Sequence, residues 1–430
     1  MMKYVLLSVF FCLYCAVSYN FVIHIFNNFF MSYKPSLKTN SRIEVADILR
    51  GIAIGGIVLI HFVEQLNFYK FPEASCEFMA SLNKTVWDSL FFMLASKMYA
   101  IFSMLFGLSF FIQHDNQAQL GKDFRPRFVW RMVLLFCWGL FDLLFYNGDI
   151  LTVYAACGLL VIPFIRANNK VLIAATIFFA LQPIEIFYIV KGLIDPATQS
   201  LNLGSSELFK AIIPAQEGGT IFDVALADLR YGFLVNFTWA IEHGRMTQTI
   251  FLFLLGIYLG RKRLFYDEGN NIEVWKKILV VSLCAFVVLY PLYDAFHDTV
   301  KAISKADRTC VQKSLDVMLN MWKNMSMMFC YVSGVVLLYY RTSARNFLSK
   351  IAPYGKMSLT NYLSQSIIGG FVFYNWGLGM FRYSGHASSL LLGVVCVALQ
   401  YMFCRWWLKR HSHGPFEMLW RKATWIGAKK

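Results

Sequence analysis

The stretch RIEVADILRGIAIGGIVLIHF, residues 42–62, opens with charged side chains and continues as an almost uninterrupted apolar run. The hydrocarbon core of a bilayer is ~30 Å thick, which takes roughly 20 apolar residues at a helical rise of ~1.5 Å each. The run therefore predicts a membrane-spanning helix, which we place at about 48–66.

Similar runs recur along the 430 residues, of which 58% are hydrophobic and only 15% charged. This leaves too little polar surface to cover a water-soluble globule of that size. The runs are continuous rather than alternating, so we predict an all-α, polytopic transmembrane helix bundle with about ten core spans. The expected spans lie at roughly 48–66, 87–112, 128–146, 150–166, 171–190, 246–260, 277–294, 317–340, 358–376 and 388–408.

A further apolar run at about 4–30 precedes the core. It has three interpretations: a signal peptide, an additional span, or a region upstream of a true start at Met31. A cleaved signal peptide would place residues 34–50 outside, against the charge pattern described next. We divide the chain into an N-terminal hydrophobic segment with a basic linker (1–40), the helix bundle (41–408) and an amphipathic tail (409–430).

Lysines and arginines in short loops accumulate on the cytoplasmic side of a membrane, so their distribution predicts orientation. The basic loops alternate with poorer ones, and both ends of the ten-span core fall on the basic side. We therefore expect a multi-pass protein of the bacterial cytoplasmic (inner) membrane with both core termini inside. The net charge of +15 then reflects topology and contact with membrane lipid, and we expect no nucleic-acid partner. The loops that carry this pattern contain Lys34, Lys38, Arg42 and Arg50; Lys122, Arg125, Arg127 and Arg131; Arg166 and Lys170; Arg261, Lys262, Arg263, Lys276 and Lys277; and Arg341, Arg345, Lys350 and Lys356.

The sequence contains neither a paired-cysteine or HExxH metal motif nor a glycine-rich nucleotide loop, so we predict no metal and no permanently bound cofactor. Most of the ten cysteines lie in apolar runs. Cys76 and Cys310 are expected in outward-facing loops, where they are either a disulfide bridge over the bundle or two unrelated thiols.

Arg50 and His61 stand eleven positions apart in the first span, which returns them to within about 20° of one helical face and ~16 Å apart along the axis. Asp47, three positions before Arg50, can orient its guanidinium. The alternative is that Arg50 anchors the helix at the cytoplasmic interface and His61 is an interfacial histidine. The functional interpretation predicts that both side chains line one continuous cavity.

Four blocks of sequence carry a resemblance to a known family: DILRGIAIGGIVLIH at 47–61, FSMLFGLSF at 102–110, YNGDILTVYAACGLLVIPF at 146–164, and APYGKMSLTNYLSQSII at 352–368 followed by HGPFEMLWR at 413–421. On these blocks the chain resembles the YeiB-like family of bacterial membrane proteins, a domain of unknown function related to the transmembrane acyltransferase superfamily. Many YeiB-like sequences carry Asn where His61 stands, whereas the arginine-to-histidine spacing is similar to that of membrane sugar O-acetyltransferases.

The resemblance implies acyl transfer from cytoplasmic acyl-CoA, as co-substrate, to an envelope glycan, lipid or small-molecule acceptor. Arg50 is suited to the CoA phosphates, and His61 to general-base or nucleophilic work. The alternatives are a small-molecule transporter or flippase that uses intramembrane charges, and a non-catalytic binding or assembly protein. The sequence does not indicate an oligomeric state.

Other polar residues at membrane depth have two interpretations each. Lys97 with Asp142 or Glu185 is expected to form an ion pair, and a proton or substrate path is the alternative. Asp149 is either a helix N-cap or the residue that orients the His61 imidazole.

Polar residues near the C-terminus also have two interpretations. Asn361 and Gln365, four apart, either join helices or bind the amides of acyl-CoA. In the tail, Glu417 and Arg421 predict an amphipathic helix at the cytoplasmic interface.

Overall fold

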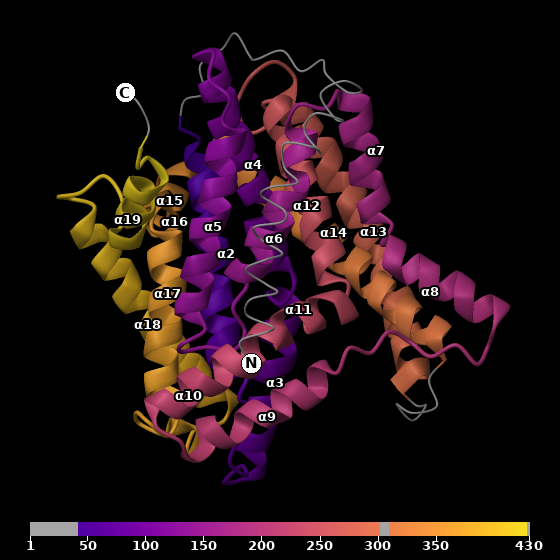
Figure 1. Ribbon diagram of the computed structural model, residues 1–430, viewed down its shortest axis with the longest axis vertical. Helices are drawn as coiled ribbons and strands as arrows, with labels where there is room; N and C mark the ends of the chain where they lie inside the picture. The colour runs from indigo at the N-terminus through magenta and orange to yellow at the C-terminus, as the bar shows by residue number, and fades with distance from the viewer. Residues whose placement is uncertain (1–41, 302–308, 428–430) are drawn as a thin grey trace.

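The computed structural model describes residues 42–301 and 309–427, and its regular secondary structure within these ranges is helical, without a strand. The predicted all-α fold is confirmed. The hydrophobic segment at 4–30, with Lys34 and Lys38 of the basic linker, lies outside the described residues. Most helices stand side by side along the long axis of the molecule, as Figure 1 shows, while α9 and α10 run across one end.

The first half of the bundle consists of α2 (Glu44–Val63), α3 (Glu77–Met93), α4 (Lys97–Gln119), α5 (Arg125–Asp142), α6 (Leu151–Val161), α7 (Asn169–Ala180) and α8 (Pro183–Ile194). The connection that follows contains α9 (Ser205–Gly218), α10 (Ile221–Ala227), a π-helical turn (Asp228–Gly232) and α11 (Phe233–Glu242). The second half consists of α12 (Arg245–Arg261), α13 (Asn271–Lys301), α14 (Cys310–Arg341), α15 (Arg345–Leu348), α16 (Ala352–Lys356), α17 (Ser358–Phe373), α18 (His386–Trp407) and α19 (Pro415–Thr424).

Fewer of the described helices have the length and hydropathy of a membrane span than the ten spans expected. Among residues 42–301 and 309–427, four helical segments are long and apolar enough to cross a bilayer: Glu44–Val63, Glu77–Gln119, Asn271–Val300 and His386–Trp407. The bent pair α7 and α8, which meet at 52°, makes a fifth if it is one span. The other helices are too short or too polar, because α5 carries Arg125, Arg127 and Arg131 and α17 has only 16 residues. A ten-span bundle is not confirmed.

Glycines bring two pairs of helices into backbone contact. A Cβ on Gly107 of α4 would overlap the Phe253 backbone of α12, and one on Gly256 of α12 would overlap the Met104 carbonyl of α4. On the other side of the bundle, a Cβ on Gly355 of α16 would overlap the Asp47 carbonyl of α2. Such close approach is typical of small residues at helix interfaces in membranes. It fixes α4 against α12 and α2 against α16.

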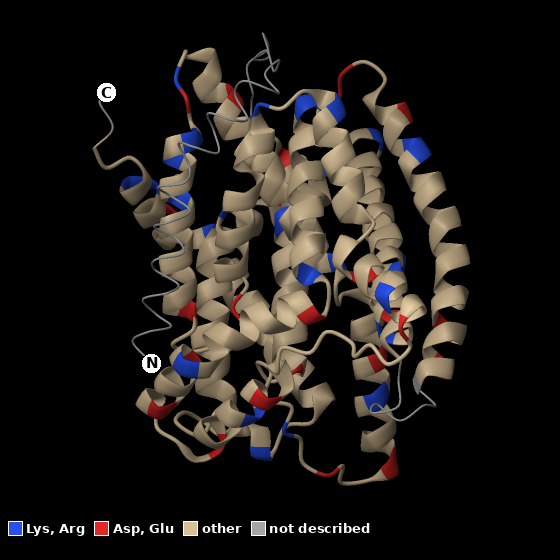
Figure 2. Ribbon diagram, turned by 45° about the vertical axis from the view of Figure 1, so that its right-hand side comes forward, with Lys and Arg blue, Asp and Glu red and all other residues tan. Residues whose placement is uncertain are grey.

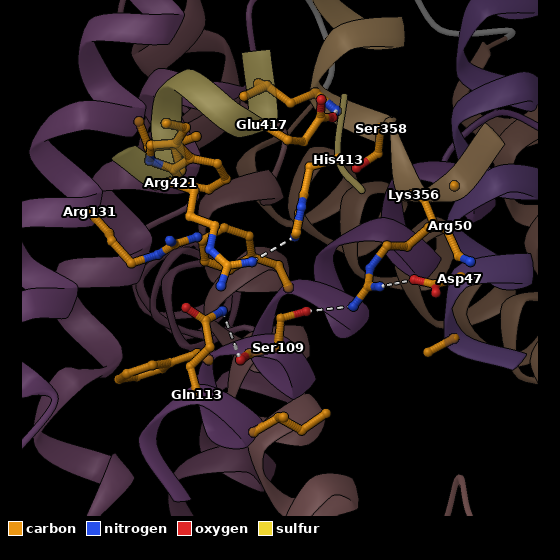
Figure 3. Close-up of a pocket in the computed structure, with 18 of the residues that line it drawn as sticks. Asp47, Arg50, Ser109, Gln113, Arg131, Lys356, Ser358, His413, Glu417 and Arg421 are labelled. Atoms are coloured by element: carbon orange, nitrogen blue, oxygen red, sulfur yellow. Dashed lines mark hydrogen bonds and ion pairs between the residues drawn. The ribbon is translucent and has the colours of Figure 1, made fainter. Parts of the chain in front are cut away.

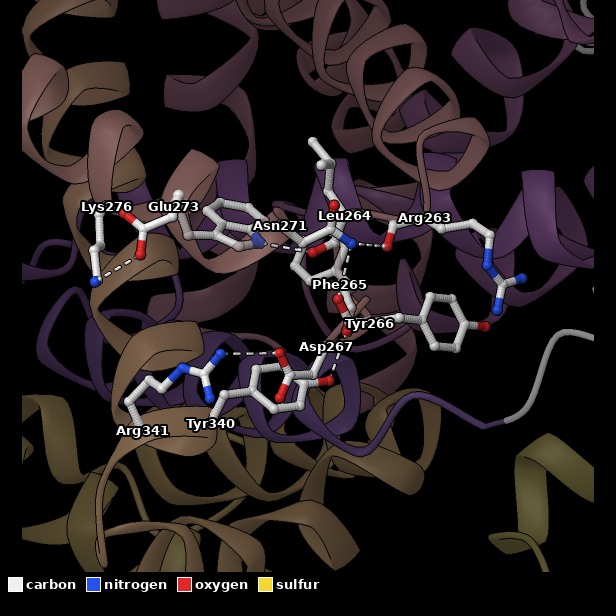
Figure 4. Close-up of polar contacts among 11 residues, drawn as sticks. Arg263, Leu264, Phe265, Tyr266, Asp267, Asn271, Glu273, Lys276, Tyr340 and Arg341 are labelled. Carbon is white, nitrogen blue, oxygen red and sulfur yellow. Dashed lines mark hydrogen bonds and ion pairs between the residues drawn. The ribbon is translucent and has the colours of Figure 1, made fainter. Parts of the chain in front are cut away.

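A network of polar contacts holds the loop between α12 and α13 (Figure 4). The Asn271 amide donates to the carbonyls of Arg263 and Tyr266, both at 2.9 Å, and the Trp275 indole donates to the Leu264 carbonyl at 2.7 Å. Arg341, at the end of α14, pairs with Asp267 at 3.2 Å. Charged side chains also mark both ends of the bundle in Figure 2.

The two cysteines expected in outer loops are both free thiols. Cys76 is exposed at the start of α3, whereas Cys310 is buried in the first turn of α14, with its thiol 3.4 Å from the Tyr188 carbonyl. The disulfide alternative is therefore wrong for this structure.

Candidate functional site

A cavity of about 630 Å³ opens between α2, α4, α5, α17 and α19 (Figure 3). Its inner wall is apolar, because aromatic and aliphatic side chains of α4, α5 and α6 line it: Phe102, Phe106, Phe110, Phe128, Met132, Leu135 and Leu151. Its rim is polar and mostly cationic. The cavity is therefore amphipathic, with charge at one end and hydrocarbon at the other.

Arg50 projects from α2 into this rim. Its guanidinium donates to Asp47 Oδ1 at 2.8 Å and to the Ser109 hydroxyl of α4 at 2.6 Å. The second Asp47 oxygen accepts from Arg42 at 2.7 Å. The orientation of Arg50 by Asp47 that the sequence predicted is present, and Ser109 adds a second point of attachment that holds the guanidinium in place.

The rim carries five arginine or lysine side chains and two carboxylates, and these seven residues are Arg42, Arg50, Arg131, Lys356, Arg421, Asp47 and Glu417. Both carboxylates are already engaged by protein donors, Asp47 by two arginines and Glu417 by the start of α17. The excess of positive charge in a partly enclosed space attracts an anionic ligand.

The tail helix α19 closes one side of the cavity. Trp420 lies under the Arg131 guanidinium at 4.1 Å, and Arg421 donates to His413 Nε2 at 2.8 Å. Burial, together with the charges of Arg421 and Arg42, lowers the pKa of His413, which keeps the imidazole neutral and able to accept that hydrogen bond. Arg127 fixes the end of the tail through the carbonyls of Thr424 and Ile426, both at 2.9 Å.

His61 lies deeper in the bundle and is not among the residues that line the cavity. Its Nδ1 is 2.9 Å from Gln365 Nε2 of α17, and its ring packs 4.9 Å from that of Tyr146. Tyr362 connects the two regions, because it lines the cavity and its ring centroid lies 6.5 Å from that of His61. The expectation that Arg50 and His61 line one cavity is wrong: Arg50 faces α4, whereas His61 packs against α17.

Asp149 caps α6. Its two carboxylate oxygens accept the backbone N–H groups of Leu151 at 2.9 Å and Thr152 at 2.8 Å. No hydrogen bond joins Asp149 to His61 among the residues that the structure describes. This geometry fits the N-cap interpretation of Asp149. The residue that contacts the His61 imidazole is Gln365, and not Asp149.

The ion pair expected of Lys97 does not form, within the described ranges, with either Asp142 or Glu185. The Lys97 ammonium donates to the Phe91 carbonyl at 3.5 Å, and the charges that act on it are those of Lys323 and Arg245. Asp142 lies at the end of α5 near Asp149 and Asp228, and Glu185 lies in the first turn of α8 near Ser314. The spacing of residues in the sequence does not show which of these helices lie next to one another.

Asn361 and Gln365 contact protein rather than the cavity. Asn361 donates to the Tyr354 carbonyl at 2.9 Å and accepts from the Cys404 thiol at 3.3 Å, so it joins α16, α17 and α18. The direct acyl-CoA contacts considered for these two residues are not part of this arrangement.

Sequence reasoning missed Arg131, Ser109, His413 and Trp420 as cavity residues. Arg131 was counted only as a topology signal, and His413 and Trp420 stand in the tail block that carried the family resemblance. Ser109 and Arg131 reach the cavity from α4 and α5, whereas His413 and Trp420 reach it only through the tertiary position of the tail.

Residues 259–427 match the family model described as "Protein of unknown function (DUF418)", and residues 42–198 match the one described as "Heparan-alpha-glucosaminide N-acetyltransferase, catalytic". The chain is similar to "Uncharacterized protein YxaH" of Bacillus subtilis (strain 168), with 28% identity over 420 residues that cover 92% of this chain and 97% of that protein. It is also similar to "Uncharacterized protein YeiB" of Escherichia coli (strain K12), with 24% identity covering 88% and 95%. No solved structure matches it. These matches confirm the predicted resemblance to the YeiB-like family.

Proposed function

We propose that this YeiB-like membrane protein transfers an acyl group from cytoplasmic acyl-CoA to an envelope glycan, lipid or small-molecule acceptor. The observation that carries the proposal is the cavity whose rim gathers five cationic side chains above an apolar wall. Coenzyme A has the complementary form, with phosphates at one end and a thioester-linked chain at the other. The match of residues 42–198 to an N-acetyltransferase catalytic model supports the same chemistry.

The rim cations have distinct tasks in this proposal. Arg50, held by Asp47 and Ser109, presents a fixed guanidinium suited to bidentate contact with a phosphate. Arg131 and Arg421, which meet Trp420 and His413, supply further positive charge from α5 and α19. The acyl chain then lies along the apolar wall near Tyr362.

The transfer needs a base for the acceptor hydroxyl or amine. His61 lies beyond Tyr362 and does not line the cavity, so the proposal requires the thioester to extend past Tyr362 to reach it. There the acceptor oxygen or nitrogen attacks the thioester carbonyl, His61 takes the acceptor proton, and the C–S bond breaks. The proton then passes to the CoA thiolate, so the products are the acylated acceptor and free CoA. A thioester supplies its own leaving group, so this step draws only on protein side chains.

Gln365 controls which nitrogen of His61 is free. When the Gln365 amide nitrogen faces His61 Nδ1, Nδ1 accepts its hydrogen bond. A neutral imidazole then carries its proton on Nε2 and cannot accept another proton there. Turning the amide by 180° lets Nδ1–H donate to the carbonyl oxygen and leaves Nε2 basic. General-base catalysis therefore requires the second arrangement.

We further propose the bacterial inner membrane as the location, with the cavity rim on the cytoplasmic side. The basic loops support this orientation, since Arg42, Arg127 and Arg421 all lie at the rim end of the bundle.

The test is acyl-CoA binding and thioester loss with purified full-length protein in nanodiscs. We expect saturable binding of CoA and acceptor-dependent release of free thiol. Absence of CoA binding would contradict the proposal. Binding without thiol release in the presence of membrane glycans and lipids would favour the transporter or the non-catalytic alternative.

A further inference from the structure

Three breaks in the helical backbone meet away from the cavity. Ser96 before α4, Gln182 before α8 and Gly244 before α12 all have left-handed backbone, with φ of 67°, 54° and 64°. The Arg245 guanidinium donates to the Ser96 hydroxyl at 2.6 Å, and a Cβ on Gly244 would overlap the Gln182 amide. Broken helices at membrane depth are tolerated where they are buried in protein or line a binding site.

Three cations gather at these breaks. Lys97 is the first residue of α4, Arg245 is the first residue of α12, and Lys323 lies in α14. Lys97 is only 4% exposed, and the charged groups that act on its ammonium are Lys323 and Arg245. Both helix N-termini add positive potential, because backbone N–H groups point outward there. The arrangement therefore places two half-buried cations, Arg245 and Lys323, beside the buried Lys97 ammonium.

Aromatic rings surround the cations. Lys323 lies 3.6 Å from the centroid of Tyr293, Arg245 lies 5.6 Å from that of Tyr99, and Lys97 lies 5.8 Å from that of Phe92. Such contacts stabilise a cation but do not neutralise it.

None of the three cations forms an ion pair with a carboxylate among residues 42–301 and 309–427. Asp294 and Asp316 act on Lys323 from beyond ion-pair distance, and Asp316 is already bound to His297 at 2.6 Å. A buried cation without an anion costs several kcal/mol by the order of magnitude of desolvation penalties. The uncompensated charge thus indicates a ligand that the described residues do not supply.

We propose that Lys97, Arg245 and Lys323 bind the phosphate group of an anionic ligand, at a site separate from the Arg50 cavity. A phosphate carries up to two negative charges and several acceptor oxygens, which fits three donors from three helices. The source of this phosphate is either a lipid headgroup or a soluble phosphate compound. The site does not depend on acyl transfer, because none of its residues lines the cavity.

The test compares the wild-type protein with Lys97→Met, Arg245→Gln and Lys323→Met, and with Arg230→Gln as a matched control. Arg230 is an exposed cation 5.1 Å from the Tyr231 ring centroid, and it takes no part in the site. Inorganic phosphate is titrated against detergent-purified protein by thermal unfolding, with chloride at equal ionic strength as reference. Retention of phosphatidylglycerol over phosphatidylcholine is measured by native mass spectrometry.

We expect phosphate or phosphatidylglycerol to bind the wild type and Arg230→Gln, and each site variant to bind at least about tenfold more weakly, or about 1.4 kcal/mol. Stabilisation by phosphate alone identifies a soluble ligand, and selective retention of phosphatidylglycerol identifies a lipid. If a variant does not fold, the wild-type measurements still decide. A wild type that responds to neither probe, or folded variants that bind as it does, would overturn the proposal.

Discussion

Glu417 in the last helix caps a helix that begins 59 residues earlier, since its Oε1 accepts the Leu359 backbone N–H at 2.7 Å. The same oxygen accepts the N–H of Thr360 at 3.0 Å, and the other accepts the Thr360 hydroxyl at 2.6 Å. The first turn of α17 would otherwise leave these donors unsatisfied. The cap therefore joins the tail to the helix that carries Tyr362 and Gln365.

Replacement of Glu417 by Ala should destabilise the protein by about 0.5–2 kcal/mol, the usual cost of losing an N-cap. Thermal unfolding of purified protein measures this, and limited proteolysis reports release of α19. Glu273→Ala is the matched control, because the Glu273 pair with Lys276 is fully exposed and such pairs contribute little to stability. Equal stability of both variants would contradict the capping role.

The Glu417 cap should also make stability depend on pH. Burial raises the pKa of the Glu417 carboxyl, and the hydrogen bonds from Thr360 and Leu359 oppose this shift only in part. A raised folded-state pKa means that the folded protein binds more protons than the unfolded one, so stability falls as pH rises from the ordinary glutamate value through the raised value. Glu417→Gln keeps an amide acceptor and should lose this pH dependence in unfolding measurements. If Glu417→Gln leaves the pH dependence of stability unchanged, Glu417 is not its source.

Removal of one rim guanidinium should weaken CoA binding. We expect Arg50→Gln and Arg131→Gln each to raise the Kd by about tenfold, because each loses a charge-assisted contact worth about 1.5 kcal/mol. The effect should shrink with added salt. Arg405→Gln is the control, as Arg405 is an exposed cation 5.9 Å from the Tyr401 ring centroid at the end of α18. Isothermal titration calorimetry of the protein in nanodiscs measures the Kd for CoA. Equal Kd values for the wild type, the two rim variants and Arg405→Gln would contradict the prediction.

His61 and Gln365 should affect turnover rather than donor binding. His61→Ala is expected to lower kcat by about 10²–10⁴-fold, the usual contribution of general acid–base catalysis, while the Kd for CoA stays the same. Gln365→Met should lower kcat less, because the base remains but its tautomer is no longer controlled. Thiol-release kinetics measure both values. A folded His61→Ala protein with wild-type kcat would remove His61 from the mechanism.

The two cysteines at the other end of the bundle test the orientation. Cys76 is exposed and Cys310 is buried, so a membrane-impermeant maleimide added outside intact cells should label Cys76 quickly and Cys310 slowly. Cys76→Ser should abolish the fast phase. Fast labelling of Cys76 only after the cytoplasmic side is opened would invert the orientation, and with it the proposed entry of acyl-CoA at Arg50.

The helical character of the chain could be predicted from the sequence, because apolar runs of the right length and the acidic first turn of α2 are local signals. The breaks at Ser96 and Gln182 could not be predicted, since both residues adopt left-handed backbone without a glycine. The single long spans expected there are instead bent or divided.

The candidate site was only half predictable. Asp47 and Arg50 are three residues apart on one helix, so their contact follows from helical geometry. Arg131, His413 and Arg421 reach the same cavity from α5 and the tail, and Lys97 meets two cations rather than a carboxylate. These relationships depend on how helices pack across hundreds of residues, which periodicity within one helix does not record.

The position of α19 has a consequence for biosynthesis. The ribosome makes Trp420, Arg421 and Trp425 after every other element of the cavity wall, although these side chains line the same space as Arg42 and Arg50. A nascent chain that has inserted α2 to α18 into the bilayer still has this space open on one side. The cavity is complete only when α19 has left the ribosome and docked on α5, so the chain cannot hold a ligand in this cavity before α19 has been made.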